Sequence, residues 1–378
     1  MAKMDNPRYV FYLAVVPVYR DACVRVLLDQ HGDQVRFYAG EAHLDETVTT
    51  GLAPDLVQRV RNVGILQNRV LIQVGHLREA MRSEVCVIDL NPRSVTAWGL
   101  AVARKILRRR TLAWGHLHPR AGASSRSAPI RVFLRRITDG TVLYGYDSVV
   151  PARSELPGKP VWVAPNSLYS TVDIKAAENS ERRRIMYVGR LEEAKNVQIL
   201  VEAFALSGLS AAGYTLDIVG FGSLEPELVK QNKKFSIDES VNIHGRIDSV
   251  TELSVLYAEA AFSVSPGYLG LTLTQSLGFG VPMLYAEDAP HSPEIELKRF
   301  GGMRSFSPTC AEGLAAAMRS FVSELDEEPV KSQHLARSVS TYYSAEAMAT
   351  GLWLALEGER SELGADGWPR STEVTRVE

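Results

Sequence analysis

The sequence contains little cysteine and no cysteine pattern of a metal site. Its 378 residues include three cysteines, Cys23, Cys86 and Cys310, which are far apart and show no CxxC spacing. An odd number of widely separated cysteines argues for a reducing compartment and against a zinc site. We therefore expect a fold that is stabilised by its hydrophobic core, without disulfides or a structural metal.

Long apolar runs are also missing. No stretch approaches the roughly 18 apolar residues of a membrane-spanning helix. The apolar run that starts at Tyr9 is short, and Pro17-Val18-Tyr19-Arg20 follows where a signal peptide would carry a small-residue cleavage site. We interpret this run as a buried first strand and expect a cytoplasmic protein.

The chain has no large excess of either charge. Its formal net charge is −2, which gives no overall attraction to nucleic acid or to a membrane surface. The hydrophobic share of 46% and the charged share of 23% are those of globular proteins. With 378 residues, the chain is long enough for two domains of roughly 100–200 residues each.

One segment departs from this balance. Residues 101–140 contain ten basic side chains and a single acid, Asp139. Such a cluster is suited to an anionic acceptor or to the inner face of a membrane, where it would make a peripheral contact through residues 104–136. The alternative is a solvated helix face whose charge is offset by acids elsewhere in the fold, and both remain open. The basic residues are Arg104, Lys105, Arg108, Arg109, Arg110, Arg120, Arg126, Arg131, Arg135 and Arg136.

Strand-like and helix-like segments alternate in the first half of the chain. This alternation predicts a parallel sheet that is covered by helices on both faces. The predicted strands are Tyr9–Val16, Val35–Tyr38, Arg69–Ile72, Val85–Asp89, Thr111–Trp114, Gly140–Tyr144 and Val161–Ala164. The predicted helices are Asp21–His31, Gly75–Ser83, Val95–Arg109 and Ile130–Thr138.

The second half repeats the alternation more clearly. The predicted strands are Arg184–Val188, Thr215–Val219, Val241–His244, Phe262–Ser265 and Pro282–Tyr285. The predicted helices are Asn196–Ser207, Ser223–Lys233, Ser249–Ala258, Thr272–Leu277 and Cys310–Leu325.

The two series predict an α/β protein with two doubly wound, Rossmann-like domains that face a cleft. In such sheets, ligands bind at the carboxyl ends of the strands. We place the first domain at residues 1–165 and the second at 166–345. A C-terminal helix is expected within 346–360, and the polar segment 361–378 is expected to be disordered.

The first chemical signal is the segment Val188-Gly189-Arg190-Leu191-Glu192-Glu193-Ala194-Lys195-Asn196. It lies between a predicted strand and a predicted helix, whose free N–H groups and dipole favour an anion. Arg190 offers a forked donor and Lys195 a compact cation, which together suit a diphosphate. The alternative is that both are surface charges paired with Glu192 and Glu193.

The second signal is a glycine-rich loop that follows the strand ending at Ser265. Gly270 would let backbone amides approach a ligand, and a helix that starts near Leu271 would supply unpaired N–H donors. Gln275, about one turn into that helix, is placed to bond a hydroxyl group. On its own this loop is weak evidence, since many αβ connections contain glycine.

A third glycine-containing stretch, Gly220-Phe221-Gly222, lacks the rest of a dinucleotide fingerprint. The third glycine of the fingerprint is missing from the residues that follow, and no acidic residue ends a following strand at the right distance. The sequence therefore argues against NAD binding.

The ordered set of these segments is more specific than any one of them. GRLEEAKN, GFGSL, NIHGRI and SPGYLGLTLTQSLGFGVP follow one another in the order found in family 4 glycosyltransferases. Over about Arg184 to Glu296 the chain resembles the C-terminal domain of this family, which implies the GT-B fold and transfer from a nucleotide sugar with retention of configuration. The resemblance also implies that Arg190 and Lys195 bind the donor diphosphate. The donor-binding residues expected from it are Gly189, Arg190, Lys195, Gly222, Arg246, Ile247, Gly267, Gly270, Leu271, Thr272 and Gln275.

The chain departs from the family at two positions. The family's usual pair of glutamates, with seven residues between them, falls here on Gly267 and Gln275. Glutamine can still bond a ribose hydroxyl, whereas Gly267 offers no side chain to the sugar. Some polysaccharide-forming members resemble the SPG form found here.

Two histidine-containing segments are further candidates. Ala113-Trp114-Gly115-His116-Leu117-His118 is similar to a segment of some of these transferases, and His116 would bond the donor sugar or orient the acceptor. The alternative is a histidine satisfied by loop backbone. His291-Ser292-Pro293-Glu294-Ile295-Glu296 either places a histidine and carboxylates near the donor or is a plain surface loop.

We therefore expect a hexosyltransferase that uses a nucleoside diphosphate sugar, with Arg190, Lys195 and His116 as its catalytic residues. No DxD-like metal motif occurs in a suitable loop, so we expect no metal and no cofactor besides the co-substrate. The acceptor is a saccharide, a lipid-linked saccharide or a small natural product, and nucleic acid is not expected as a partner. The alternatives are a non-catalytic sugar-nucleotide-binding subunit of a transferase, and an epimerase or phosphorylase of the same architecture; for a phosphorylase, no lysine suited to pyridoxal phosphate is evident.

Overall fold

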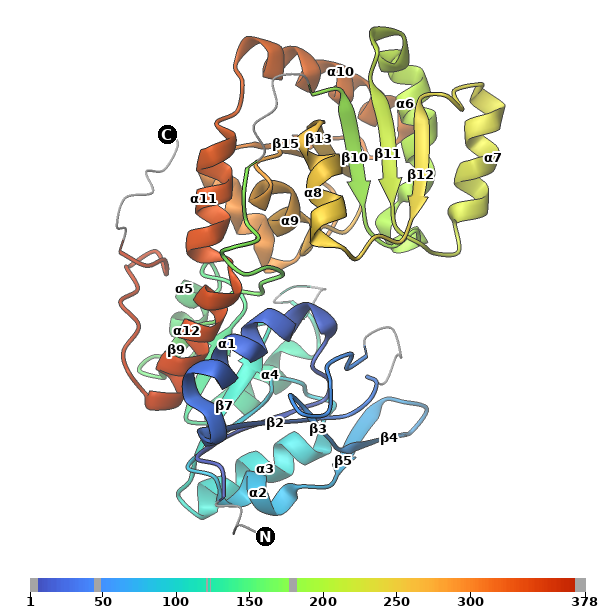
Figure 1. The fold of residues 1–378 in the computed structure, drawn as a ribbon. Coiled ribbons are helices and arrows are strands. Elements are labelled where there is room, and N and C mark those ends of the chain that lie inside the picture. Colours follow the sequence, from blue (N-terminus) through green and yellow to red (C-terminus); the bar gives the residue numbers. More distant parts are fainter. Residues whose placement is uncertain (1–5, 44–48, 120–121, 123, 177–181, 371–378) are drawn as a thin grey trace. The chain divides into compact units, whose positions relative to one another are not determined.

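The computed structural model describes residues 6–43, 49–119, 122, 124–176 and 182–370. The chain forms two compact units (Figure 1). Among the described residues, the first unit comprises those up to Ser170 together with those from Tyr343 onward, and the second comprises those from Thr171 to Tyr342. The boundary lies five residues beyond the one expected from the sequence.

The first unit is built on a parallel sheet. Within the described residues its strand order is β3-β2-β1-β6-β7-β8-β9, and every neighbouring pair is parallel. The strands are β1 (Tyr9–Leu13), β2 (Val35–Ala39), β3 (Gln58–Arg59), β6 (Val85–Asp89), β7 (Arg110–Gly115), β8 (Gly140–Leu143) and β9 (Val161–Val163). The helices are α1 (Asp21–His31), α2 (Leu77–Arg82), α3 (Val95–Ile106), α4 (Ala128–Ile137), α5 (Val149–Glu155) and α12 (Ala345–Glu357).

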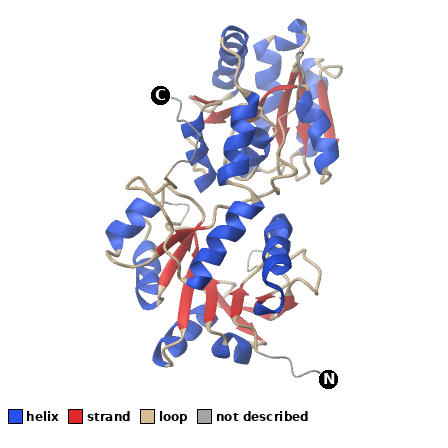
Figure 2. Cartoon of the chain, turned by 60° about the vertical axis from the view of Figure 1, so that its left-hand side comes forward, coloured by secondary structure: helices blue, strands red, loops and turns tan. Residues whose placement is uncertain are grey.

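Helices cover both faces of this sheet (Figure 2). All five residues of β1 are buried, as expected for a central strand of a parallel sheet that reads as a continuous apolar run. One core lies between the sheet, α1 and α12, and the other lies against α2, α3 and α4. A Cβ at Gly351 would lie 1.9 Å from the carbonyl oxygen of Val163, so α12 packs against the backbone of β9.

The predicted strand Arg69–Ile72 does not join the parallel sheet. It is instead part of β5 (Val70–Val74), which pairs antiparallel with β4 (Arg61–Ile65). Leu66, Gln67 and Asn68 all have positive φ, between 53° and 60°, and form the tight turn of this hairpin. The alternation rule therefore assigned the wrong partner to a correctly located strand.

The expected disorder of the C-terminal segment is also not found in its described part, residues 361–370. Leu363 and Pro369 form an isolated antiparallel bridge. The ring of Trp368, which is 4% exposed, stacks on Tyr146, and its Nε1 donates to Asp147 at 2.7 Å. One large buried aromatic side chain thus anchors a segment that is otherwise polar; residues 371–378 lie outside the described part.

The second unit repeats the architecture. Its strand order is β12-β11-β10-β13-β14-β15 over the residues described, again with parallel pairs. The strands are β10 (Arg184–Val188), β11 (Thr215–Val219), β12 (Val241–Gly245), β13 (Ala260–Ser265), β14 (Met283–Ala286) and β15 (Met303–Phe306). The helices are α6 (Leu200–Ser207), α7 (Glu225–Phe235), α8 (Val250–Ala258), α9 (Thr272–Gly278), α10 (Ala311–Glu327) and α11 (Ser332–Tyr342).

Each unit has one point at which the strand order reverses. In the first unit β1 lies between β2 and β6, and in the second unit β10 lies between β11 and β13. Loops that leave the two neighbouring strands at such a point diverge to opposite faces of the sheet and leave a crevice at the carboxyl edge. The structure therefore offers one candidate binding edge in each unit.

Candidate functional site

The candidate donor site lies at the carboxyl edge of the second sheet, where β10 and β13 are neighbours. Arg190 follows the end of β10, and Gly267 follows the end of β13. The two segments that the sequence singled out therefore meet at the reversal point of the sheet. This is the place where doubly wound sheets bind their ligands.

Glycines let the loops at this edge approach one another closely. A Cβ at Gly220 would lie 1.8 Å from the carbonyl oxygen of Gly189, and one at Gly222 would lie 2.3 Å from that of Leu191. The amide of Gly189 donates to Val219 at 2.9 Å, and the amide of Leu191 donates to Phe221 at 2.9 Å. No side chain fits at positions 220 and 222, so the loops after β10 and β11 run side by side.

Arg190 is held mainly through its backbone. The hydroxyl of Tyr187 donates to the carbonyl oxygen of Arg190 at 2.8 Å. The Arg190 side chain is 45% exposed and donates from Nη1 to Glu192 at 3.1 Å, as the surface-pair alternative predicts. An exposed pair of this kind contributes only about 0–1 kcal/mol, so a ligand anion can exchange for the glutamate at little cost.

Lys195 is tied to the loop that follows β13. Its Nζ donates to the carbonyl oxygen of Tyr268 at 2.7 Å and lies 4.9 Å from the centre of the Tyr268 ring. The amide of Tyr268 donates to Ala194 at 3.4 Å, and Nδ2 of Asn196 donates to Pro266 at 3.2 Å. Lys195 is therefore fixed against the glycine-rich loop.

The same contact between the two loops explains why position 267 is a glycine. A Cβ at this position would lie 2.6–2.9 Å from the carbonyl carbon, carbonyl oxygen and Cα of Lys195. These are backbone atoms, which cannot move aside as the end of a flexible side chain can. Because position 267 has no room for any side chain, a glutamate cannot stand there while the two loops lie this close.

The predicted helix start beside these cations is displaced. Glu193–Lys195 and Val197–Ile199 form two 3-10 turns, separated by Asn196 with a φ of 52°, and α6 begins only at Leu200. The left-handed conformation of Asn196 breaks the helical path, which asparagine tolerates better than most residues. The α-helical dipole assumed from the sequence is therefore not next to Arg190.

The second predicted helix, α9, begins at Thr272 with Leu271 as its N-terminal cap. The carbonyl of Gly270 accepts from the amide of Leu273 at 2.9 Å, and the hydroxyl of Thr274 donates to the carbonyl of Leu271 at 2.7 Å. The first turn of α9 is thus closed by its own residues.

Gln275 lies one turn into α9 and is 5% exposed. Its Nε2 has no hydrogen-bond partner among the described residues. An unsatisfied buried donor of this kind costs about 1–3 kcal/mol. A ligand oxygen at this position would remove that cost.

The segment around His291 packs onto the glycine-rich loop. Nδ1 of His291 accepts from the amide of Leu269 at 3.3 Å, while Nε2 lies 2.9 Å from the carbonyl oxygen of Ala286 and donates to it. Burial lowers the pKa of His291, the hydrogen bond to the Ala286 carbonyl opposes this, and the positive charge of Lys195 lowers the pKa further, so the site favours the neutral ring. Glu294 and Glu296 are buried, so the alternative of a plain surface loop is wrong.

Arg246 and Ile247 follow β12 at the same edge of the sheet. The Arg246 guanidinium lies 5.2 Å from the centre of the Phe221 ring and donates from Nε to Asp248. Phe221 is exposed, so this cation–aromatic pair presents a flat surface to solvent.

His116, the remaining predicted site residue, belongs to the first unit and follows the end of β7. Its side chain is exposed, and its ring meets that of Tyr144 edge-on with 4.8 Å between the centres. Nη1 of Arg131 donates to its carbonyl oxygen at 3.1 Å. The structure brings together the predicted residues of the second unit at one edge and places His116 at the carboxyl edge of the first.

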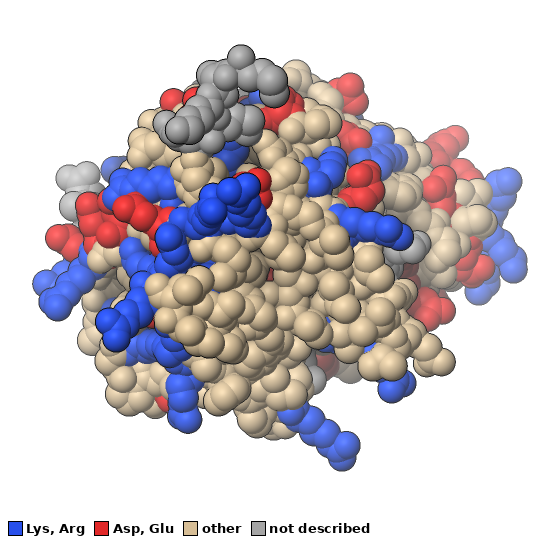
Figure 3. Space-filling view, turned by 90° about the horizontal axis from the view of Figure 1, so that it is seen from below, with Lys and Arg blue, Asp and Glu red and all other residues tan. Residues whose placement is uncertain are grey.

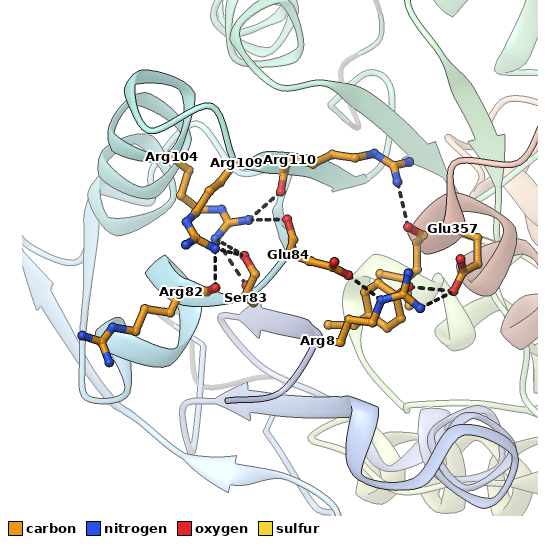
Figure 4. Close-up of polar contacts among 10 residues, drawn as sticks. Arg8, Arg82, Ser83, Glu84, Arg104, Arg109, Arg110 and Glu357 are labelled. Atoms are coloured by element: carbon orange, nitrogen blue, oxygen red, sulfur yellow. Dashed lines mark hydrogen bonds and ion pairs between the residues drawn. The ribbon is translucent and has the colours of Figure 1, made fainter. Parts of the chain in front are cut away.

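The basic cluster 101–140 is partly structural. Arg104 is fully buried and donates to the carbonyl oxygens of Ala80, Ser83 and Glu84, among others. Arg110 donates to the carbonyl oxygens of Ala355 and Leu356 at the end of α12. Figure 4 shows these side chains turned toward the backbone, whereas the side chain of Arg82 points away. Arg135 is also buried and pairs with Glu155, so neither alternative predicted from the sequence describes the whole cluster.

The described part of the chain contains no helix that is both long enough and apolar enough to cross a membrane.

Comparisons with known proteins bear on the same region. Residues 171–334 match the family described as glycosyl transferases group 1. Two curated relatives, glycogen synthases of two Mycobacterium tuberculosis strains, are 29% identical over 157 residues. This match covers 41% of the chain and only 36% of the relatives' length.

Solved structures resemble nearly the whole chain. Anabaena HepE in complex with UDP has a TM-score of 0.65 at 14% identity and covers 93% of this chain and 100% of its own. A glycosyltransferase from Rickettsia africae has a TM-score of 0.65 at 13% identity, with coverage of 93% and 98%. The lipopolysaccharide outer core galactosyltransferase WaaB has a TM-score of 0.62 at 11% identity, with coverage of 93% and 99%.

These likenesses confirm the predicted α/β architecture of the GT-B type, with two Rossmann-like units. The match to the glycosyl transferases group 1 family over residues 171–334 agrees with the resemblance on which the sequence interpretation rested.

Proposed function

We propose that the protein transfers a hexose from a nucleoside diphosphate sugar to an acceptor hydroxyl, with retention of anomeric configuration. The observation that carries this proposal is the interlocked edge of the second sheet, where Lys195 is fixed against the loop of Gly267 beside Arg190. Two cations at a reversal point suit a diphosphate. Solved relatives of the same fold are described as complexes with UDP, which agrees with such a donor.

In this proposal the bond between the anomeric carbon and the diphosphate oxygen breaks while the acceptor oxygen attacks from the same face. The acceptor's proton passes to the leaving diphosphate. Arg190 and Lys195 stabilise the negative charge that grows on the leaving group, and fixed charges of this kind act without reorganisation during the reaction. No metal or other cofactor takes part.

Gln275 and His116 have positioning roles in the same proposal. Nε2 of Gln275, which is buried and has no partner in the described part of the chain, donates to an oxygen of the donor, on its ribose or its sugar. His116 bonds the donor sugar or orients the acceptor from the first unit. Gly267 has no contact with the sugar, since no side chain fits there.

The experiment is a panel of nucleoside diphosphate sugars, incubated with the pure protein and with acceptor extracts. We expect release of free nucleoside diphosphate from one donor, dependent on acceptor. Binding without release under any condition would favour the second candidate, a non-catalytic sugar-nucleotide-binding subunit. The replacement of both family glutamates by Gly267 and Gln275 is the observation that keeps this candidate in view.

A peripheral membrane contact is the second part of the proposal. On the face of the first unit in Figure 3, Lys and Arg side chains gather beside a broad surface of uncharged residues. Ile106, Leu107 and Phe133 are exposed apolar side chains in or next to α3 and α4, and exposed Lys105, Arg108 and Arg136 belong to the same segments. Apolar side chains flanked by cations suit the surface of an anionic membrane.

Sedimentation with anionic vesicles at low salt tests this contact. We expect Ile106→Asn, at a position 76% exposed, to weaken binding, and Val255→Asn in α8, at a position 61% exposed, to leave it unchanged. Failure of the unmodified protein to sediment with the vesicles would exclude the membrane contact without bearing on the transfer reaction.

A further inference from the structure

A cavity lies at the carboxyl edge of the first sheet. It has a volume of about 530 Å³ and is lined by residues that follow β1, β6 and β7. Ala14 follows β1, Asp89 ends β6, and these two strands are neighbours at the reversal point of this sheet. The cavity therefore occupies, in the first unit, the position that the candidate donor site occupies in the second.

The charge of its lining is positive. Arg20, Arg93 and Arg131 line the cavity, and the carboxyl of Asp89 is the acid among the lining residues. The other titratable groups of the lining are His43, His116, Tyr19 and Tyr144. Burial raises the pKa of Asp89, although the amide of Ala14 and the charge of Arg20 oppose this.

Arg20 is fixed by aromatic side chains. It is 6% exposed, its Nη2 donates to the hydroxyl of Tyr144 at 2.6 Å, and its guanidinium lies 4.4 Å from the centre of the Trp114 ring. A guanidinium held in this way loses little freedom when it binds a ligand. Arg20 is thus an ordered cation at a cavity wall.

The cavity walls also contain donors that lack acceptors. Nε of Arg20, Nε of Arg131 and Nε1 of Trp114 are buried and have no hydrogen-bond partner within the described ranges. Nη1 of Arg131, in contrast, donates to the carbonyl oxygens of Leu90 and His116, at 2.7 and 3.1 Å. Each unsatisfied buried donor costs about 1–3 kcal/mol, and a ligand that supplies oxygen acceptors would remove part of this cost.

We propose that this cavity binds an oxyanion, a phosphate or carboxylate group carried by the acceptor. The inference rests on the proposed transfer reaction and extends it by naming an anionic class of acceptor. A planar, forked guanidinium donates two parallel hydrogen bonds to the oxygens of a phosphate or carboxylate. A neutral sugar has no charged pair of oxygens to accept them.

Equilibrium binding by calorimetry, on the full chain and without any donor, tests the inference. The probes are glucose 6-phosphate, glucuronate and glucose. We expect the two anionic probes to bind at least about tenfold more tightly than glucose, since one charge-assisted contact is worth about 1.5–3 kcal/mol. Arg93→Gln and Arg131→Gln should remove most of this preference.

Arg82→Gln is the matched control, because its side chain is exposed and belongs to α2, which leads into the opposite end of β6. Arg93 is also exposed, so its replacement tests the cavity without disturbing the contacts of Arg20 with Tyr144 and Trp114, even if Arg131→Gln does not fold. Equal affinity for the three sugars, or the same loss in Arg82→Gln as in Arg93→Gln, would overturn the inference.

A competition experiment with UDP shows whether the bound oxyanion belongs to the acceptor or to the donor. The anionic probe should still bind in the presence of saturating UDP, and Arg93→Gln should leave the affinity for UDP unchanged. Displacement by UDP together with weaker UDP binding in Arg93→Gln would assign the cavity to the donor diphosphate and overturn the proposal. Absence of UDP binding by the unmodified protein would instead count against the proposed function alone.

Discussion

The two reversal points of this protein are built by different means. The edge at β10 and β13 is formed mainly by backbone contacts, because Gly220, Gly222 and Gly267 let three loops touch. The edge at β1 and β6 is formed by side chains, because Arg20 lies among the rings of Trp114 and Tyr144. The same sheet topology thus gives one edge that is closely packed and one that contains a cavity.

This difference teaches what each edge can recognise. A backbone-built edge fixes the position of a few cations and suits a group common to all donors, such as a diphosphate. A side-chain-built cavity can change its charge and shape by substitution without disturbing the sheet. We therefore expect donor binding to be sensitive to small changes in loop geometry, and acceptor choice to depend on individual side chains.

The largest effect is expected for Arg190→Ala. Loss of one charge-stabilising donor costs about 10²–10³ in turnover, measured here as release of nucleoside diphosphate. Arg304→Ala is the control, because Arg304 is also an exposed arginine paired with a glutamate of the second unit at 3.1 Å. Near-normal turnover of Arg190→Ala would break the assignment of this edge to the donor.

Gly267→Ala tests the packed edge directly. The added Cβ would meet the Lys195 backbone, and overpacking of this kind costs about 1–3 kcal/mol. Each kcal/mol lowers the Tm of a unit of this size by about 2–4 °C, which calorimetry can follow together with donor affinity. Gly99→Ala in α3, where no atom lies within 4 Å of the added Cβ, should be neutral or stabilising. An unchanged Tm for Gly267→Ala would show that the loops are not in contact.

Gln275→Leu should separate binding from stability. Removal of Nε2, a buried donor without a partner among the residues described, leaves stability unchanged or raised, while donor affinity falls by about tenfold, or 1.4 kcal/mol. Titration with donor and urea unfolding measure the two quantities. A parallel loss of both would mean that Gln275 supports the fold of α9 instead of the ligand.

The smallest effect concerns pH. Burial lowers the pKa of His291 in the second unit and of His31 in the first, so between the folded and unfolded pKa values the unfolded chain binds more protons. The stability from each neutral ring is present above the unfolded pKa, about 6.5, and is lost as pH falls. Urea unfolding at pH 7.5 and 5.5 should therefore show a smaller loss in His291→Gln than in the unmodified protein. His31→Gln should reduce the pH-dependent loss of stability of the first unit in the same way. If neither variant loses less stability than the unmodified protein, the lowered pKa values are contradicted.

The sequence predicted the buried strands well, because strands covered on both faces read as continuous apolar runs. β10 and β11 have the predicted bounds. The polar strand β15 and the helix α11 were not predicted, since residues 303–306 include exposed Arg304 and show no continuous apolar run. The hairpin β4–β5 was misassigned because a strand pattern carries no information on its partner.

The sequence predicted which segments meet at the candidate site, but not the geometry of their contact. The motif order located Arg190, Lys195 and the glycine-rich loop, whereas the crowding at Gly267 arises between segments far apart in the chain. The left-handed Asn196, which displaces the start of α6, carries no distinctive pattern. Arg20 was missed because it stands seven residues beyond the end of β1, in the 3-10 turn Val18–Arg20, where no motif marks it.

The return of α12 to the first unit has a consequence for synthesis. Its side chains Ala345, Met348 and Leu352 belong to the same core as Phe11 and Leu13 of β1. On the ribosome, the second unit is therefore translated in full before the first can bury the apolar face of its opening strand. A nascent chain stopped after α11 would expose that face, so this protein is expected to need shielding by a chaperone until its final helix emerges.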